Sequence, residues 1–442
     1  MNDQHREGLE WDDSGWDLVP RWAREPRLEA IAELCRRVLE LAAGDHCHVA
    51  FYAEGAFNKL YLVESRRGKS LLRVSLPVDP RHKTHGECAT LHWIREMTTV
   101  PVPKVIAFDD CRDNEIGFEW ILMELMPGVS AYKRWRKLSM AEKTQVVEQV
   151  AEFQSQLFRH GIEDANFQSI GTLRFGDGTS QLGPGNPKPG RLVSRFFFGG
   201  DRFNYDVPRG PFRSSHDWLG TQLGIVREEQ SRILETAEDE EDRADAKAIL
   251  RGAEKLAALL PKIFPQLQNN PLERTVLWHD DLSLANILIG EKDAKITAII
   301  DWEGVSCEPL WVAAEMPKFL RGPSREEEPQ RDRYGEANEY DQDDELDNEG
   351  KTGLYWIHLM EYDMTQLRKV YAAKMRELWP RWEEEVTYSS LKSDLYEALH
   401  RLSDGWQVKR VEKWVDLVIE GGEFPRLSDV LARPADEART IP

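Results

Sequence analysis

The polar residues most able to support chemistry lie between positions 277 and 303, in the segment LWHDDLSLANILIGEKDAKITAIIDWE. His279, Asp281 and Asn286 follow the spacing H-x-D-x-x-x-x-N, and Asp301 ends the apolar run that comes later in the segment. Phosphoryl transfer needs a carboxylate that orients an attacking hydroxyl and accepts its proton. It also needs hard oxygen ligands that hold Mg²⁺ against nucleotide phosphates. We interpret Asp281 as the base, with His279 in the same catalytic loop, and Asn286 and Asp301 as ligands of Mg²⁺.

A β-hairpin is expected to position these side chains. Residues 287–289 and 296–300 are apolar and separated by a polar turn near 291–294, so Asn286 and Asp301 should meet at the same end of the ribbon. The alternative is that these are ordinary loop residues, because Asp and Asn favour turns. The loop motif alone arises by chance in roughly one chain of this size in fifty. A strand that ends in Asp makes a coincidence rarer and favours the functional interpretation.

The segments before this hairpin predict a small antiparallel sheet. Pro26 opens a predicted helix, and residues 47–76 contain three β-like runs separated by turns at Glu54-Gly55 and Arg67-Gly68. A helix around 87–97 and strands at 104–108 and 118–123 complete a predicted nucleotide-binding lobe over 47–127, preceded by an N-terminal extension and helix over 1–46.

From Ser139 onward the pattern is mainly helical and predicts a second lobe over 128–442. Ser139 and Glu142 form a capping box. Residues of about 172–225 are rich in Gly, Pro and Phe and predict a long ordered insertion. Helical periodicity follows at about 226–259, 352–376, 389–403 and 408–419, and residues of about 324–350 predict a solvated, mobile acidic loop.

Composition excludes several classes of function. The 442 residues carry a net charge of −20, which argues against nucleic acid as a partner. Twelve acidic residues and two arginines between Glu326 and Glu349 supply half of that charge. No run approaches the roughly 18 apolar residues of a membrane span. Five scattered cysteines and an N-terminus without a presequence pattern lead us to expect a reduced, cytoplasmic protein.

HDDLSLANILI and AIIDWE resemble the catalytic loop and metal-binding segment of the aminoglycoside phosphotransferase and choline kinase group, which is related to protein kinases. GAFNKLY, LLRVSLP, GECATLHWI and RGPFRSSHDWL are similar to a fungal branch of that group, some members of which are linked to mitochondrial inheritance. The resemblance implies an α+β, protein kinase-like two-lobed fold. It also implies a phosphotransferase that uses ATP and Mg²⁺ to phosphorylate a small-molecule hydroxyl, and leaves a mitochondrial location open.

The resemblance also implies roles in the first lobe. Gly55 and Asn58 of GAFNKLY would lie in a hairpin that covers the nucleotide phosphates, although a plain β-turn explains Gly55 equally well. Arg73 takes the place of the phosphate-binding lysine of protein kinases, and Glu87 would be its partner. The alternative is a surface pair worth under about 1 kcal/mol.

The run WILMELMPG resembles the hinge between the lobes of that group. By this resemblance, the backbone of Glu124 and Met126 would meet the adenine edge of the nucleotide. A core strand that ends at Pro127 explains the run equally well, because main-chain contacts need no particular side chain.

Two departures from the family pattern leave alternatives open. Asp280 replaces a glycine, so it could raise the pKa of Asp281 by repulsion or point to solvent. Arg73 replaces a lysine, so a nucleotide-binding scaffold with little catalysis remains an alternative. A protein kinase is less favoured, because no A-P-E segment follows Asp301.

The acceptor and the oligomeric state are not readable from the sequence. Acidic and aromatic side chains of the second lobe are candidates for a pocket that takes a cationic amine or sugar, although such aromatic residues are more often helix core. These candidates are Trp302, Trp311, Glu315, Tyr355, Trp356 and Glu361.

Overall fold

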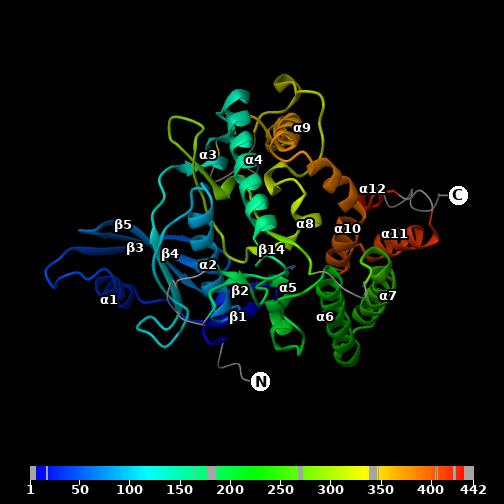
Figure 1. Ribbon diagram of the computed structural model, residues 1–442, viewed down its shortest axis with the longest axis horizontal. Coiled ribbons are helices and arrows are strands. Elements are labelled where there is room, and N and C mark those ends of the chain that lie inside the picture. The colour runs from blue at the N-terminus through cyan, green and yellow to red at the C-terminus, as the bar shows by residue number, and fades with distance from the viewer. Residues whose placement is uncertain are drawn as a thin grey trace.

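The computed structural model describes residues 6–15, 18–164, 166–176, 186–266, 272–337, 346, 348–403, 405, 407–421 and 425–432. These residues form a sheet-containing lobe and a mainly helical lobe that pack side by side (Figure 1). The predicted α+β, two-lobed fold class is confirmed.

The first lobe is built on a five-stranded antiparallel sheet with the strand order β3-β4-β5-β7-β6. Its strands are β3 (Cys47–Glu54), β4 (Asn58–Ser65), β5 (Gly68–Ser75), β6 (Val105–Asp109) and β7 (Glu119–Glu124). The predicted consecutive hairpins form, because β4 pairs antiparallel with both β3 and β5.

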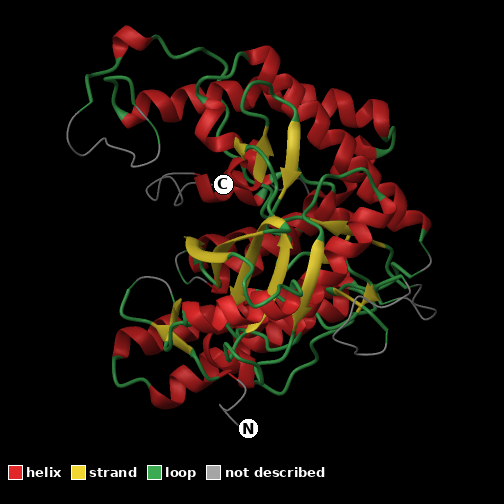
Figure 2. Ribbon diagram, turned by 90° about the vertical axis from the view of Figure 1, so that its left-hand side faces the viewer, coloured by secondary structure: helices red, strands yellow, loops and turns green. Residues whose placement is uncertain are grey.

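Helices cover the two faces of this sheet (Figure 2). Leu72 and Val74 of β5 pack in one cluster with Ile31 of α1 (Leu28–Val38). Ile121 of β7 belongs to the cluster on the other face, which includes α2 (His82–Met97). Because side chains alternate along a strand, Arg73 lies on the α2 face, between two residues that point to α1.

Helix α2 begins at His82, one turn before the predicted start at Glu87. Arg81, the residue before this helix, has a left-handed φ of 68°, and its N–H donates to the Glu119 carboxylate at 2.6 Å. The first turn of the helix is polar in sequence but buried, so apolar periodicity could not reveal it.

The N-terminal segment forms a hairpin that the sequence did not predict. Its strands are β1 (Leu9–Asp12) and β2 (Val19–Trp22). Leu9 and Trp22 pack against a small buried cluster that joins Leu76 of the first lobe to Val193 and Phe198 of the insertion. The hairpin therefore ties the insertion to the sheet lobe.

The second lobe contains most of the helices and three small sheets. Its helices are α3 (Ala131–Trp135), α4 (Met140–Glu163), α5 (Arg195–Phe198), α6 (Ser215–Thr236), α7 (Glu240–Ile263), α8 (Leu310–Ala313), α9 (Gly353–Leu378), α10 (Trp382–Ser403), α11 (Val408–Glu420) and α12 (Leu427–Ala432). Its short 3-10 helices are Gly200–Asn204, Leu284–Asn286, Lys318–Leu320 and Arg331–Arg333. Its strands are β8 (Val129–Ser130), β9 (Leu173–Arg174), β10 (Lys188–Pro189), β11 (Thr275–Trp278), β12 (Ile287–Ile289), β13 (Ile296–Ile299) and β14 (Ser306–Pro309).

The predicted capping box is present at the start of α4, where the Ser139 hydroxyl and the Glu142 carboxylate each accept a backbone N–H of the other residue. We expected helical patterns over about 226–259, and the structure has two helices there, the first of which begins earlier than expected. Helix α6 begins at Ser215, inside the segment predicted as insertion, where the Ser214 hydroxyl caps it. A second cap at Asp239 then starts α7 as a separate helix.

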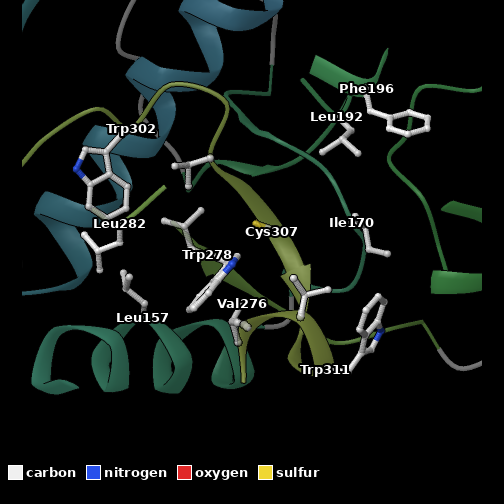
Figure 3. Packing of buried hydrophobic residues seen from close by; sticks show 14 of the residues in the cluster. Leu157, Ile170, Leu192, Phe196, Val276, Trp278, Leu282, Trp302, Cys307 and Trp311 are labelled. Atoms are coloured by element: carbon white, nitrogen blue, oxygen red, sulfur yellow. The ribbon is translucent and has the colours of Figure 1, made fainter. Parts of the chain in front are cut away.

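The paired strands β11 and β14 run through the core of the second lobe (Figure 3). Leu157 of α4 and Trp302 lie on one side of this pair in the view, and Leu192 and Phe196 of the insertion lie on the other. All four side chains are buried. The insertion is thus part of the lobe's core, as its aromatic content predicted.

Part of the predicted acidic loop is described and contacts α9. The Tyr334 hydroxyl lies 2.7 Å from Nδ1 of His358, and Arg331 pairs with Glu349 at 3.2 Å. Residues 338–345 and 347 of this loop lie outside the described residues, so its predicted mobility stays a prediction. In the described part of the chain, no helix combines the length and the apolar character needed to cross a bilayer.

Candidate active site

The predicted catalytic loop connects β11 to β12 and is held by its own side chains. Nε2 of His279 lies 3.1 Å from the carbonyl oxygen of Ile300, and the ring packs against Trp302 with centroids 4.8 Å apart. The Asn286 amide donates to the backbone carbonyl of Asp281 at 2.9 Å. These contacts fix the loop against the strand end that precedes Asp301.

His279 is suited to positioning the loop. Its side chain is buried, and burial lowers its pKa even though the hydrogen bond to Ile300 acts in the opposite direction. A neutral imidazole between Ile300 and Trp302 can orient the backbone without carrying charge.

The hairpin places Asn286 and Asp301, the predicted ligands of Mg²⁺, at the same end, as expected. Ile287 of β12 pairs with Ile299 of β13, and the Ile300 N–H donates to the backbone carbonyl of Asn286 at 3.0 Å. Asp301 follows directly and has a left-handed φ of 65°. Non-glycine residues rarely adopt this conformation, and such strain is concentrated at functional sites.

Asp281 points toward the same end of the hairpin. One of its carboxylate oxygens lies 3.3 Å from the Asn286 amide nitrogen, and the other pairs with Lys318 at 2.5 Å. Asp280 is 81% exposed and lies 3.6 Å from Arg321, and it lines a cavity together with Asp281. Its side chain therefore reaches solvent while staying beside the proposed base.

Arg73 connects the sheet lobe to the hairpin. Its guanidinium is buried, bonds Glu87 of α2 through Nη1, and donates from Nη2 to Asp301 at 2.7 Å. Glu303 lies 3.5 Å away. The predicted pairing of Arg73 with Glu87 is therefore present, and it is a buried pair rather than a surface one.

Lys83 is a residue of this site that sequence reasoning missed. Its ammonium lies 2.6 Å from Glu303 and 2.8 Å from the amide oxygen of Asn58. Burial alone would raise the pKa of Glu303, but Lys83 and Arg73 lower it to about 2. The available signal was the spacing of Lys83 and Glu87, four residues apart on one helix, which places both on the same face.

Of the other predicted nucleotide contacts, Asn58 joins this network directly. The Gly55 N–H donates to the backbone carbonyl of Asn58 at 2.9 Å across the connection between β3 and β4, and the Asn58 amide donates to Glu303 at 2.7 Å. Glu124 ends β7, and its N–H donates to Lys104 at 2.9 Å. Met126 is half-buried two residues later.

A cavity of about 330 Å³ opens beside these groups. His279, Asp281 and Asp301 line it, together with Lys83 and Glu303. Apolar side chains of the insertion and of the helical lobe form much of the rest of the lining. These are Leu192, Val193, Phe198, Trp218, Val312 and Tyr396. Asp280, Ser194 and Arg195 add polar groups to it.

Glu308 is a second residue that the sequence did not reveal, and it lines the same cavity. One carboxyl oxygen accepts from the Ser306 hydroxyl at 2.6 Å. The other is buried and has no hydrogen-bond partner among the described residues. Burial raises the pKa of Glu308 to about 8, although the bond from Ser306 acts in the opposite direction. This carboxyl is available to a polar group of a bound molecule.

None of the six acidic and aromatic candidates for an acceptor pocket lines this cavity. Trp302 and Trp311 are buried in the core of the second lobe. Tyr355 and Trp356 lie on α9 beside Arg331 of the acidic loop. Their position agrees with the alternative that such aromatic residues are core, and the residues facing Asp281 are different ones.

Asn286 and Asp301 fit a Mg²⁺ site by their chemistry. Asn286 directs its amide nitrogen to Asp281, which leaves its amide oxygen for a cation. Among the described residues, no group of three His, Cys, Asp or Glu side chains could hold a metal by itself. A site of two protein oxygens that phosphate oxygens and waters complete is the form that Mg²⁺ prefers with nucleotides.

Comparison with known proteins places these residues in a family context. The model described as "Phosphotransferase enzyme family" matches residues 48–346. A subtelomeric hrmA-associated cluster protein of Aspergillus fumigatus is 29% identical over 318 residues, which are 62% of this chain and 61% of that protein. Altered inheritance of mitochondria protein 9, mitochondrial, of Eremothecium gossypii is 23% identical over 314 residues, 62% of this chain and 50% of the relative. The aligned part thus spans between half and six tenths of these relatives.

Solved structures give a weaker likeness. Aminoglycoside phosphotransferase APH(4)-Ia has 14% identity and a TM-score of 0.42, with 88% of this chain and 99% of that chain covered. Aminoglycoside-3'-phosphotransferase of type VIII has 17% identity and a TM-score of 0.38, with 85% and 97% covered. The family model covers more than half of the 442 residues and includes both the sheet lobe and the hairpin. The chain therefore belongs to the phosphotransferase enzyme family.

Proposed function

We propose that this chain is an ATP- and Mg²⁺-dependent phosphotransferase that acts on a hydroxyl of a small molecule. Family membership supports the general reaction. The observation that carries the proposal is the convergence of Asp281, Asn286 and Asp301 at one end of the β12–β13 hairpin, beside a cavity that the buried Lys83 lines and with Arg73 bonded to Asp301.

In this proposal Asp281 orients the acceptor hydroxyl and takes its proton as the oxygen attacks the γ-phosphorus. The new P–O bond forms while the bond to the oxygen of the leaving nucleoside diphosphate breaks. Asn286 and Asp301 would hold Mg²⁺, which supplies neutralisation of phosphate charge. Arg73, kept in place by Glu87, is close enough to Asp301 to share its donors with phosphate oxygens.

The acceptor would occupy the part of the cavity beyond Asp281, toward Trp218, Tyr396 and Glu308. Its walls are mainly aromatic and aliphatic, and Asp280 and the Glu308 carboxyl are polar groups in its lining. This lining suits a compact molecule with one apolar face and a group that hydrogen bonds to Glu308.

The test has two parts, and the first is binding. ATP with Mg²⁺ should raise the melting temperature of the parent protein, and ATP with EDTA should raise it much less. Asp301→Ala should lose most of the Mg²⁺-dependent shift, because it removes a proposed ligand. An equal shift in both proteins would count against the metal role of Asp301.

The second part is turnover with a panel of hydroxylated metabolites. Consumption of ATP that depends on one acceptor supports the enzyme. Binding of Mg-ATP without turnover across the panel would favour a nucleotide-binding scaffold.

A further inference from the structure

The proposed base, Asp281, forms an ion pair with Lys318. We propose that Lys318 is a further catalytic residue, which exchanges Asp281 for an oxygen of the transferring phosphoryl group and offsets its negative charge. This inference rests on the proposed function, since it assigns a role in the same transfer.

The geometry puts the ammonium next to the proposed base. Nζ of Lys318 lies 2.5 Å from Oδ1 of Asp281, while the Asn286 amide lies 3.3 Å from the other oxygen. The two paired side chains are 58% and 54% exposed. An exposed pair of this kind contributes little to stability, so a phosphate oxygen can replace the carboxylate at little cost.

The backbone around Lys318 is fixed, which distinguishes it from an ordinary surface lysine. The Phe319 N–H donates to the Leu282 carbonyl of the catalytic loop at 3.1 Å. Arg368 of α9 donates to the Leu320 carbonyl at 2.6 Å. Phe319 and Leu320 are buried. The segment is therefore tied both to the loop that carries Asp281 and to the helical lobe.

Charge explains why the transfer needs a cation at this point. The phosphoryl group carries negative charge on three oxygens as it approaches the hydroxyl that Asp281 holds. Arg73 and Lys83 pair with Glu87, Asp301 and Glu303, so their donors lie on the Asp301 side of the site. Lys318 lies beside Asp281 itself, where it would offset the repulsion between the carboxylate and the phosphoryl oxygens.

The proton balance of the step is unchanged by this role. The acceptor proton goes to Asp281, the acceptor oxygen bonds phosphorus, and the bond to the leaving diphosphate oxygen breaks. Lys318 stays protonated throughout and acts as a cation and hydrogen-bond donor. Groups of this kind, aimed at charge that develops in the transition state, contribute roughly 10²-fold or more to rate.

The test needs no knowledge of the acceptor. Mg-ADP with aluminium fluoride, a planar mimic of the transferring phosphoryl group, is compared with Mg-ADP alone by titration calorimetry. Transition-state mimics bind tighter than ground-state ligands. We expect Lys318→Met to bind Mg-ADP within about twofold of the parent but to lose at least about tenfold of the extra affinity that aluminium fluoride gives. Lys318→Arg should recover part of it.

Lys369→Met is the matched control, because Lys369 is 60% exposed and pairs at 3.0 Å with Glu326 rather than with the proposed base. It should retain the full effect of aluminium fluoride. Because the Lys318 pair is exposed, both methionine variants should melt within about 1 °C of the parent.

Three results would overturn the inference. Lys318→Met could keep the parent's full gain with aluminium fluoride, or the parent could bind Mg-ADP and gain nothing from aluminium fluoride. Either result removes the role of Lys318 while leaving nucleotide binding intact. A parent that fails to bind Mg-ADP at all would remove the proposed function as well, so the two failures are distinguishable.

Discussion

The carboxyl groups around the cavity differ in their neighbours, and the neighbours decide their charge at neutral pH. Glu303 faces Lys83 and Arg73, which hold its pKa near 2 despite burial. Glu308 is buried with a hydroxyl as its contact, and its pKa rises to about 8. One group is thus an anion that binds cations, and the other is mostly an acid that can donate a hydrogen bond. Opposite shifts of two carboxyls in one cavity are typical of sites that bind and transform polar molecules.

Glu308→Gln tests this assignment through stability against pH. The folded pKa of about 8 exceeds the ordinary value of 4.5. Between these values the folded state binds more protons than the unfolded state, so the free energy of unfolding falls as pH rises. Glutamine mimics the protonated acid and removes this dependence. From pH 5 to pH 9, we expect the parent to lose more than about 1 kcal/mol relative to the variant.

The measurement is urea denaturation of both proteins at pH 5, 7 and 9. Burial also raises the pKa of Glu119, to about 7, but this residue is present in both proteins and cancels in the comparison. Equal slopes against pH would show that Glu308 is not held in the protonated form.

At the scale of elements, the β12–β13 hairpin depends on how closely β8 packs against it. Gly128 precedes β8 with a left-handed φ of 109°. A Cβ there would lie 2.3 Å from the Thr297 hydroxyl oxygen and 2.6 Å from the Ile289 carbonyl oxygen. Only glycine fits both the conformation and the space. The turn that ends the first lobe therefore also sets the position of the hairpin.

Gly128→Ala should destabilise the protein by about 2 kcal/mol or more, because it combines backbone strain with overpacking. Gly55→Ala is the control, since its Cβ would meet no atom within 4 Å and its φ is not left-handed. The control should stay within about 0.5 kcal/mol of the parent. Urea denaturation measures both, and two equal effects would contradict the packing argument.

The predictable elements were those whose signal is local. The runs that form β3, β4 and β5 and the hairpin that carries Asp301 could be read from apolar runs and turns. The missed features depend on contacts distant in sequence. Lys83 pairs with Glu303, which is 220 residues away in sequence, and Lys318 pairs with Asp281, which is 37 residues away. The polar turn that carries Lys83 and the short strand that carries Glu308 show no apolar periodicity, and the spacing of Lys83 and Glu87 is informative only once the helix is known to begin before Lys83.

At the scale of the whole molecule, a charged network joins the two lobes. Glu303 follows the hairpin of the second lobe, whereas Asn58, Arg73 and Lys83 belong to the sheet lobe. All three of these side chains contact the Glu303 carboxylate. The side chain of Glu303 is only 16% exposed, and that of Lys83 is 4% exposed. The network therefore fixes the sheet lobe relative to the hairpin and its proposed metal ligands.

Glu303→Gln should weaken this connection. It leaves the buried ammonium of Lys83 without an anionic partner at close range, and breaking such a buried pair costs about 2 kcal/mol or more. Thermal denaturation should show a clear loss. Glu326→Gln, which alters an exposed pair with Lys369, should show almost none. Equal melting temperatures for the two variants would contradict a stabilising role for the network.

The most direct test of phosphoryl transfer at the hairpin is the turnover of Asp281→Asn with an acceptor found by the metabolite screen. The amide keeps the shape of the side chain but cannot accept the proton. We expect turnover to fall by at least about 10²-fold, while Mg-ATP raises the melting temperature of the variant as it does that of the parent. Turnover equal to that of the parent would show that Asp281 is not the base and would contradict the account.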